Sequence, residues 1–242
     1  MWRYGDAGDK YPVEPGQVWV VDAPPLDTVH TSRFLCADLE HDGKTINDFL
    51  LGYGSHGMPF IRCSYTDLPY NQGLAQGFRT KAGLKNKADF EALTEKVIDY
   101  ASLHVAGCSF FEVGREHADR IANLCYENDA EDVKTWGITY HKTAPAALIG
   151  ASWQDDKWGR CITEESPEGM DDMHTPSWAI SCHTNEGEYV LDLCMGRGLT
   201  ATSARKLDRH VVGVELHPRR LAVTLDKVSK LDRSRPFKEI AE

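Results

Sequence analysis

The stretch EYVLDLCMGRGLTATSARKLDRHVVGVELHP, residues 188–218, constrains the fold more than any other part of the chain. An apolar run ends at Asp192, a turn holds Gly196 and Gly198, and a helical pattern leads to a second apolar run that ends at Glu215. Glycines at such a helix start let a ligand approach the backbone, and an acid after the second strand can accept ribose hydroxyls. Glu215 stands 23 positions after Asp192, close to the ~20 that are typical. The stretch therefore predicts a strand–turn–helix–strand unit that binds a nucleoside-containing cofactor.

The rest of the chain repeats this alternation. Apolar runs predict further strands at 17–23, 33–38, 59–64, 108–113 and 133–141. Helical spacing predicts helices at 44–53, 86–105 (with Asn86 as its cap), 115–128, about 198–208 and from Pro218 onward. Strands that alternate with such helices form βαβ units, so we expect an α/β fold with a doubly wound, mostly parallel sheet. Residues 142–187 lack the pattern and predict a surface loop or small insertion.

Length and composition narrow the class of protein. The 242 residues suit one large domain better than two small ones. No apolar run approaches the ~18 residues that would cross a bilayer, and the first residues have no apolar signal core. The seven cysteines are odd in number and form no Cys-x-x-Cys pair, which favours reduced thiols and a cytoplasmic protein. The net charge of −10 is unusual for a nucleic-acid binder, although a local basic patch remains compatible with it.

A second motif, SYTDLPYNQG at residues 64–73, follows the expected strand at 59–64. It sets an acid, Asp67, three positions before an aromatic residue, Tyr70, with Leu68 and Pro69 between them. The plainer interpretation is a turn that begins with an aspartate and buries a tyrosine. A similar phrase, DAPPLD at 22–27, has Leu26 in place of the aromatic residue and is interpreted as a rigid turn.

Together the two motifs resemble the amino-group DNA methyltransferases that use S-adenosylmethionine. VLDLCMGRGLTA (190–201) resembles their cofactor motif Asp-Pro-Phe-x-Gly-x-Gly, and TDLPYN (66–71) resembles their catalytic motif Asp/Asn/Ser-Pro-Pro-Tyr/Phe/Trp. The catalytic motif comes first by 125 positions, which is the permuted order of the beta group. MHTPSW (173–178) is similar to the segment that precedes the cofactor strand in that group, and WGITYHK (136–142) to the strand near the end of its catalytic half.

This resemblance implies an organisation for the whole chain. It implies a Rossmann-like class I methyltransferase fold with a seven-stranded sheet, in one domain over 1–242. The catalytic half would cover about 15–142, a short recognition insertion about 143–173, and the cofactor half about 174–231. Leu68 replaces the usual first proline, and Leu193 with Cys194 replaces the Pro-Phe of the cofactor motif. An insertion of about 30 residues is short for a segment that recognises a specific sequence in duplex DNA. An accessory recognition partner or a homodimer therefore stays possible.

The chemistry of methyl transfer explains why such a loop holds these residues. An exocyclic amine is a poor nucleophile because its lone pair is delocalised into the ring, so the resemblance assigns Asp67 and the Leu68 carbonyl to accept its two N–H groups. Pro69 would rigidify the turn and Tyr70 would stack on a base flipped out of the helix. Because position 68 acts through its carbonyl, Leu68→Pro is expected to preserve activity. The expected cofactor-binding residues are Asp192, Cys194, Gly196, Gly198, Thr200, Glu215, His174 and Thr175.

Other side chains are candidates for contacts with nucleic acid. The stretch 71–87 follows Tyr70 and predicts a flexible basic loop whose Arg79, Lys81, Lys85 and Lys87 contact phosphates. Trp153 and Trp158, with Lys157 and Arg160, could face bases, whereas the acids between Glu164 and Asp172 should point away from DNA. Cys161, His174, Cys182 and His183 match no familiar zinc spacing, so we expect no metal.

The sequence favours methyl transfer to an amino group in DNA, with adenine N6 ahead of cytosine. It leaves open the same fold acting on RNA, a free nucleotide or a protein glutamine amide, and a catalytically silent binding subunit. A nicotinamide-dependent oxidoreductase is disfavoured, because Ala201 stands where a dinucleotide motif often has its third glycine.

Overall fold

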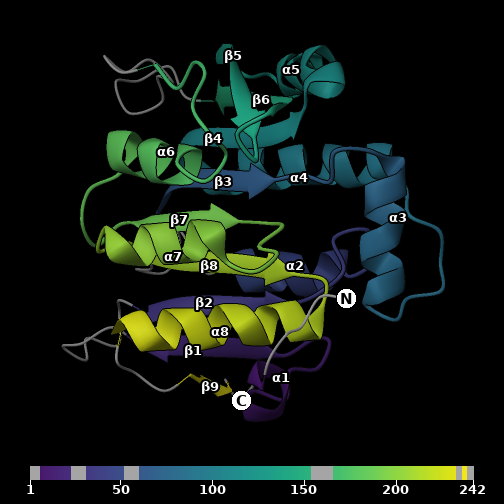
Figure 1. Cartoon of the computed structure of the whole chain (residues 1–242), viewed down its shortest axis with the longest axis vertical. Coiled ribbons are helices and arrows are strands. Elements are labelled where there is room, and N and C mark those ends of the chain that lie inside the picture. The colour runs from purple at the N-terminus through teal and green to yellow at the C-terminus, as the bar shows by residue number, and fades with distance from the viewer. Residues whose placement is uncertain (1–5, 23–30, 52–59, 154–165, 233–235, 239–242) are drawn as a thin grey trace.

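A computed structural model describes residues 6–22, 31–51, 60–153, 166–232 and 236–238. Within them one sheet has nine strands in the order β5-β6-β4-β3-β7-β8-β2-β1-β9 (Figure 1). The strands are β1 (Val18–Asp22), β2 (Thr31–Cys36), β3 (Ile61–Asp67), β4 (Val105–Gly114), β5 (Asp132–Tyr140), β6 (Ala144–Ser152), β7 (Tyr189–Asp192), β8 (His210–Glu215) and β9 (Phe237–Lys238).

The sheet is parallel at its centre and antiparallel at both sides. Strands β4, β3, β7, β8 and β2 pair in parallel, whereas β6 and β5 on one side and β1 and β9 on the other pair antiparallel. All seven strands that the sequence predicts are present. With β6 and β9, the sheet has nine strands in the described residues. The α/β class is confirmed, and the expected count of seven strands is corrected.

Helices cover both faces of the sheet, as a doubly wound fold requires. They are α1 (Ala7–Lys10), α2 (Gly43–Leu50), α3 (Gln72–Lys81), α4 (Phe90–His104), the 3₁₀ turn η1 (Arg115–His117), α5 (Ala118–Glu127), α6 (Thr175–His183), α7 (Leu199–Lys206) and α8 (Pro218–Asp232). In Figure 1, α6, α7 and α8 lie in front of the sheet and α2 and α4 behind it. One apolar cluster joins α2, α4 and α5 to the sheet, and another joins α1, α7 and α8 to its opposite face.

Strand β6 lies where a loop or insertion was expected, so that expectation was wrong. Its sequence, APAALIGAS, is rich in alanine, which has low strand propensity, and this hid the strand. It is buried between β4 and β5, where a Cβ on Gly150 would come within 2.9 Å of the Trp136 ring. Small residues are therefore needed at this place in the sheet.

Two helix boundaries also differ from expectation. Helix α4 begins at Phe90, and its cap is Asp89, which accepts the Ala92 N–H at 3.1 Å; Asn86 contacts His41 instead. The expected flexible loop is largely helix α3, which Asn71 caps by accepting the Leu74 N–H at 3.0 Å. No helix in the described part of the chain has the length and apolar character needed to cross a membrane.

Candidate active site

Acidic residues gather at the edge where the central parallel strands end. Asp67 ends β3, Asp192 ends β7 and Glu215 ends β8, and Glu112 on β4 is the register partner of Asp67. Carboxyl ends of parallel strands meet at one edge of a sheet, which is where open α/β folds bind ligands. Helix α3 stands beside this edge (Figure 1).

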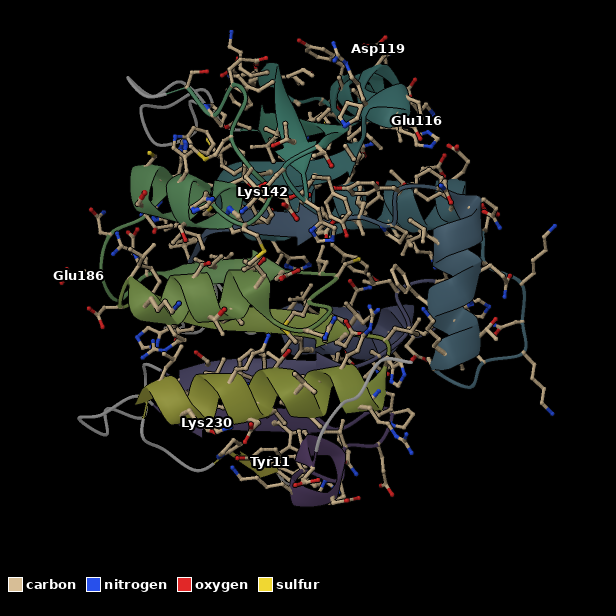
Figure 2. All side chains as sticks on the ribbon, viewed as in Figure 1. Tyr11, Glu116, Asp119, Lys142, Glu186 and Lys230 are labelled. Carbon is tan, nitrogen blue, oxygen red and sulfur yellow. The ribbon has the colours of Figure 1, made fainter. Side chains whose placement is uncertain are left out.

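Two cavities open at this edge and share the side chain of Asp67. The first is lined by the loop Asp67–Tyr70, by residues 37–40 after β2, by Leu74 and Phe78 of α3, and by Glu215 with Arg220. The second is lined by Glu112, Asp172, Asp192, Thr200 and residues of α7 and α8, including Lys230, which Figure 2 labels on α8. Asp67, Cys194 and Gly196 line both, so the cavities meet where the catalytic and cofactor motifs meet.

The cofactor turn is held by the two acids that flank it. Glu215 accepts the Gly196 N–H at 2.6 Å and the His217 N–H at 2.8 Å, and Asp192 accepts the Cys194 N–H at 3.1 Å. Gly196 has φ of 55°, and a Cβ there would meet nothing closer than 3.9 Å, so its outer side is open to a ligand.

Gly198 also has a packing role, which the sequence did not predict. It also has positive φ, 74°, but a Cβ there would lie 2.6 Å from the Thr224 side chain. Glycine is therefore required at this position for α7 to pack against α8. Gly196 lines both cavities at this edge, and a ligand contact at Gly198 stays a prediction.

Burial and crowding make this edge unusual electrostatically. Burial raises the pKa of both Asp192 and Glu215 to about 7. Asp67 is exposed at the junction of the cavities, yet the surrounding protein and the charges of Glu112, Asp192 and Asp172 hold its pKa well above the usual range. Several carboxylates that ionise only at cost are suited to a ligand that brings positive charge to them.

The loop after Asp67 is fixed by contacts with β4. Leu68 is buried in the core, and its N–H donates to the Glu112 carbonyl at 3.0 Å. The Tyr70 hydroxyl donates to Glu112 Oε1 at 2.6 Å, and the Tyr70 ring lies 4.8 Å from that of Tyr140. The expected turn is thus a defined loop that leaves Asp67 exposed while Leu68 is buried beside it.

Glu112 was not predicted from the sequence, although it belongs to this site. Its Oε2 accepts the Tyr65 hydroxyl at 2.5 Å, and Tyr65 contacts the Thr175 hydroxyl at 2.6 Å. Burial raises the pKa of Glu112 to about 7, even though both tyrosine hydroxyls favour its ionised form. The available signal was its place near the end of the run 108–113, which is the next expected strand after the one leading to Asp67.

Known proteins resemble this chain in its fold, and a family model matches its cofactor half. A DNA methylase family model matches residues 173–226. M1.HpyAVI, whose complex with S-adenosylmethionine is also solved, is 19% identical with a TM-score of 0.55, over 81% of this chain and 97% of its own. The S-adenosylmethionine complex of TTHA0409 from Thermus thermophilus, a candidate DNA modification methylase, is 16% identical with a TM-score of 0.57, over 84% and 96%.

The cytosine-N4-specific PvuII DNA methyltransferase is 10% identical with a TM-score of 0.51, over 84% of this chain and 91% of its own. The chain has the class I methyltransferase fold. Comparison with curated protein sequences finds no match. Because these structural likenesses are at low identity, they show the fold of this chain alone.

Two predicted cofactor residues of this methyltransferase fold do not line either cavity. Thr175 is fully buried, and its hydroxyl contacts Tyr65 and donates to the Asp172 carbonyl at 3.1 Å. His174 is exposed at the start of α6. Their neighbours Met173 and Pro176 line the second cavity instead. The segment therefore borders the site, and a cofactor contact by His174 or Thr175 stays a prediction.

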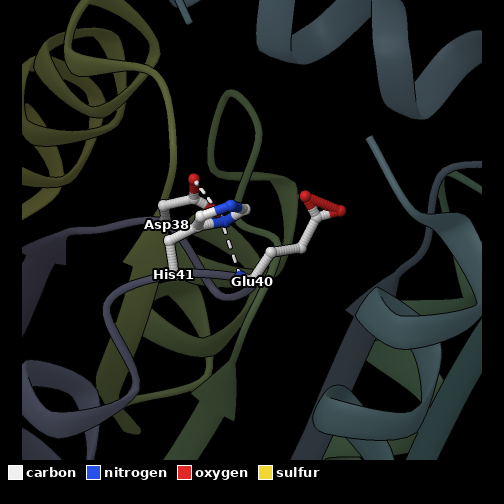
Figure 3. Close-up of side chains that lie close together, drawn as sticks. All are labelled: Asp38, Glu40 and His41. Carbon is white, nitrogen blue, oxygen red and sulfur yellow. Dashed lines mark hydrogen bonds and ion pairs between the residues drawn. The ribbon is translucent and has the colours of Figure 1, made fainter. Parts of the chain in front are cut away.

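Arg79 was expected to contact phosphate, and its surroundings contradict this. It is 3% exposed, and its guanidinium donates to Asp38 at 2.9 and 2.8 Å and pairs with Glu40. Asp38, Glu40 and His41 lie close enough to share a metal ion (Figure 3). The two carboxylates are already matched by Arg79, so we interpret the group as an ion-pair network. Lys81, Lys85 and Lys87 are exposed, and their phosphate contacts remain predictions.

The predicted recognition insertion is shorter than expected and partly outside the described residues. Strand β6 accounts for 144–152, and Trp153 packs on the core with its indole N–H donating to the Asn128 carbonyl at 2.7 Å. Trp158, Lys157, Arg160 and Cys161 lie outside the described residues, as do residues 23–27 of DAPPLD. Asp172, one of the acids expected to point away from DNA, is buried and lines the second cavity, and its orientation relative to DNA stays a prediction.

Proposed function

We propose that this protein transfers a methyl group from S-adenosylmethionine to an exocyclic amine of a base in DNA, with adenine N6 the favoured target. The observation that carries the proposal is the meeting of the two cavities at Asp67, Cys194 and Gly196. A carboxylate able to bind an amine thereby borders the turn expected to hold the cofactor. The family match over 173–226 supports the same interpretation.

The residues around the turn suit the cofactor. Glu215 ends the second strand of the unit and lines the first cavity, where it can accept ribose hydroxyls. Asp192 and Thr200 line the second cavity, which can take the amino-acid part, and Gly196, whose outer side is open, lines both cavities. When bound, S-adenosylmethionine supplies an activated methyl group, and its positive charges favour ionisation of the crowded acids.

The loop 67–70 supplies the groups that the amine requires. The Asp67 carboxylate accepts one N–H of the amine and the Leu68 carbonyl accepts the other, which frees the nitrogen lone pair for attack on the methyl carbon. Tyr70 stacks on the flipped base. Catalysis then comes mainly from holding the amine in line with the methyl group. The motif order, with Asp67 before Asp192, supports assignment to the permuted beta group with a Leu-Pro form of the loop.

A parallel assay tests this proposal. The purified chain is incubated with methyl-labelled S-adenosylmethionine and duplex DNA, single-stranded DNA, RNA, nucleotides or a glutamine-containing peptide, and the products are digested and identified by mass spectrometry. We expect N6-methyladenine in DNA, abolished in Asp67→Ala while cofactor binding survives. Asp119→Ala, which removes an exposed aspartate of α5 labelled in Figure 2, is the matched control and should retain full transfer.

Other outcomes have distinct meanings. Detection of N4-methylcytosine would show that cytosine, and not adenine, is the target. Transfer only to RNA, a nucleotide or the peptide would show that DNA is not the substrate. These alternatives gain support from the net charge of −10 and from an insertion shortened by β6. Cofactor binding without any transfer would indicate a silent subunit, and no cofactor binding at all would refute the proposal.

A further inference from the structure

Glu112 joins Tyr70, the aromatic residue of the catalytic loop, to the sheet by a side-chain hydrogen bond. It lies on β4, is 2% exposed, and uses each carboxylate oxygen for a different tyrosine. Oε1 accepts the hydroxyl of Tyr70, and Oε2 accepts that of Tyr65. Both phenols act as donors, which requires two acceptor oxygens and therefore suits a carboxylate better than an amide.

The ring of Tyr70 is consequently held at two points. Its hydroxyl is fixed by Glu112, and the centroid of its ring lies 4.8 Å from that of Tyr140 at an interplanar angle of 60°. Tyr70 follows Asp67 by three positions, so any rotation of this ring alters the space beside the Asp67 carboxylate in the first cavity. Tyr65 is tied in turn to Thr175 at the start of α6, which anchors the other end of the Glu112 carboxylate.

We infer that Glu112 is a positioning residue for methyl transfer, which holds the Tyr70 ring in the orientation that stacks the target base beside Asp67. This inference rests on the proposed function and adds to it a residue that acts through Tyr70. Loss of the hydrogen bond frees the ring to rotate about its side-chain bonds. The base is then misplaced relative to the methyl group, and small misplacements are costly in such reactions.

Glu112 also lines the second cavity, so a direct cofactor contact is the competing role. The two roles differ in what they change. A cofactor ligand contributes to cofactor affinity whatever residue stands at position 70. A residue that acts through the Tyr70 hydroxyl contributes to turnover, and its contribution vanishes once that hydroxyl is removed.

A double-mutant cycle separates these roles. The variants are Glu112→Gln, Tyr70→Phe and the pair, with Tyr126→Phe, at an exposed tyrosine of α5, as matched control. Cofactor affinity is measured by calorimetry, and kcat at saturating DNA and cofactor, at a pH on the plateau of every variant, where the effect of Glu112 on the Asp67 pKa does not enter. We expect each single variant to lower kcat about tenfold, with cofactor Kd unchanged, and the pair to lose less than about twofold beyond Tyr70→Phe. Tyr126→Phe should match the wild type.

The outcomes that overturn the inference are specific. Independent, multiplicative losses in the pair would show that Glu112 does not act through Tyr70. A raised cofactor Kd with unchanged kcat would make Glu112 a cofactor ligand. Thermal unfolding of each variant verifies that the fold is intact, and loss of the fold in Glu112→Gln alone would assign Glu112 a structural role. Absence of transfer by the wild type on every substrate is the separate result that refutes the proposed function, and the inference with it.

Discussion

Asp67 and Glu112 are register partners on the adjacent parallel strands β3 and β4, and both carboxyl groups stand at the edge where those strands end. The protein around the Asp67 side chain limits its hydration, which raises the pKa of Asp67 most, and the charge of Glu112 raises it next. Glu112 has its own pKa raised to about 7. The two groups therefore titrate in each other's field, and neither is an ordinary surface acid.

This pairing predicts the pH dependence of methyl transfer. Asp67 must be ionised to accept an amine N–H, so activity falls as pH drops through its raised pKa, well above the ordinary aspartate value. Glu112→Gln removes one neighbouring charge and should shift this acidic limb to lower pH, while also lowering the plateau rate. Profiles of kcat/KM across the neutral range, extended on both sides, measure the shift. If the acidic limb of the profile lay at the same pH in the wild type and in Glu112→Gln, Glu112 would not influence the pKa of Asp67.

A second prediction concerns stability. Asp192 has its pKa raised to about 7 in the folded chain, against 3.8 for an ordinary aspartate. The folded state thus holds its proton more tightly, and the cost of ionisation is absent below about pH 4 and complete above about pH 7. Asp192→Asn should raise the free energy of unfolding by about 1–3 kcal/mol at about pH 8 and by little at about pH 3.5, where aspartate is largely protonated in both states. Denaturant titrations at both values test this, and equal effects at both would contradict it.

A third prediction concerns Leu68→Pro. The sequence predicts that proline preserves activity, because only the carbonyl of residue 68 is used. Proline removes the N–H that donates to the Glu112 carbonyl and replaces a side chain that is 1% exposed. We therefore expect kcat per folded molecule to be kept and stability to fall by about 2 kcal/mol or more. Leu68→Met, which keeps the N–H and the volume, is the control. Intact stability in Leu68→Pro would show that the N–H bond contributes little.

A fourth prediction separates Arg79 from the exposed lysines. Lys85→Ala should weaken DNA binding similarly for all sequences and reduce the slope of log affinity against log salt by about one, as expected for one phosphate contact. Arg79→Ala should instead lower stability by about 3–5 kcal/mol, because it leaves the carboxylates of Asp38 and Glu40 unmatched. Salt titrations of binding and thermal unfolding, run on both variants, distinguish the two roles. A salt slope unaffected by Lys85→Ala would remove this lysine from the interface.

The sequence alone determined the features that depend on short-range pattern. The strand–turn–helix–strand unit with Asp192, Gly196 and Glu215 followed from apolar spacing and glycine placement, and it forms at the predicted positions. Because β3 and β7 are adjacent and parallel, the two motifs that lie 125 positions apart meet at one edge.

Tertiary structure decided the features that depend on partners distant in the chain. Strand β6 has a weak local signal and forms because β4 and β5 supply its hydrogen bonds and bury its small residues. Arg79 looks like a phosphate contact by charge alone, but Asp38 and Glu40 come from the turn after β2 to bury it. In the sequence, Glu112 is one acid within an apolar run. Its place beside Asp67 follows only from the pairing of β4 with β3. The spacing of apolar residues along the chain predicts whether each element is a helix or a strand. The partner of a buried charge is determined only when elements distant in the chain pack together.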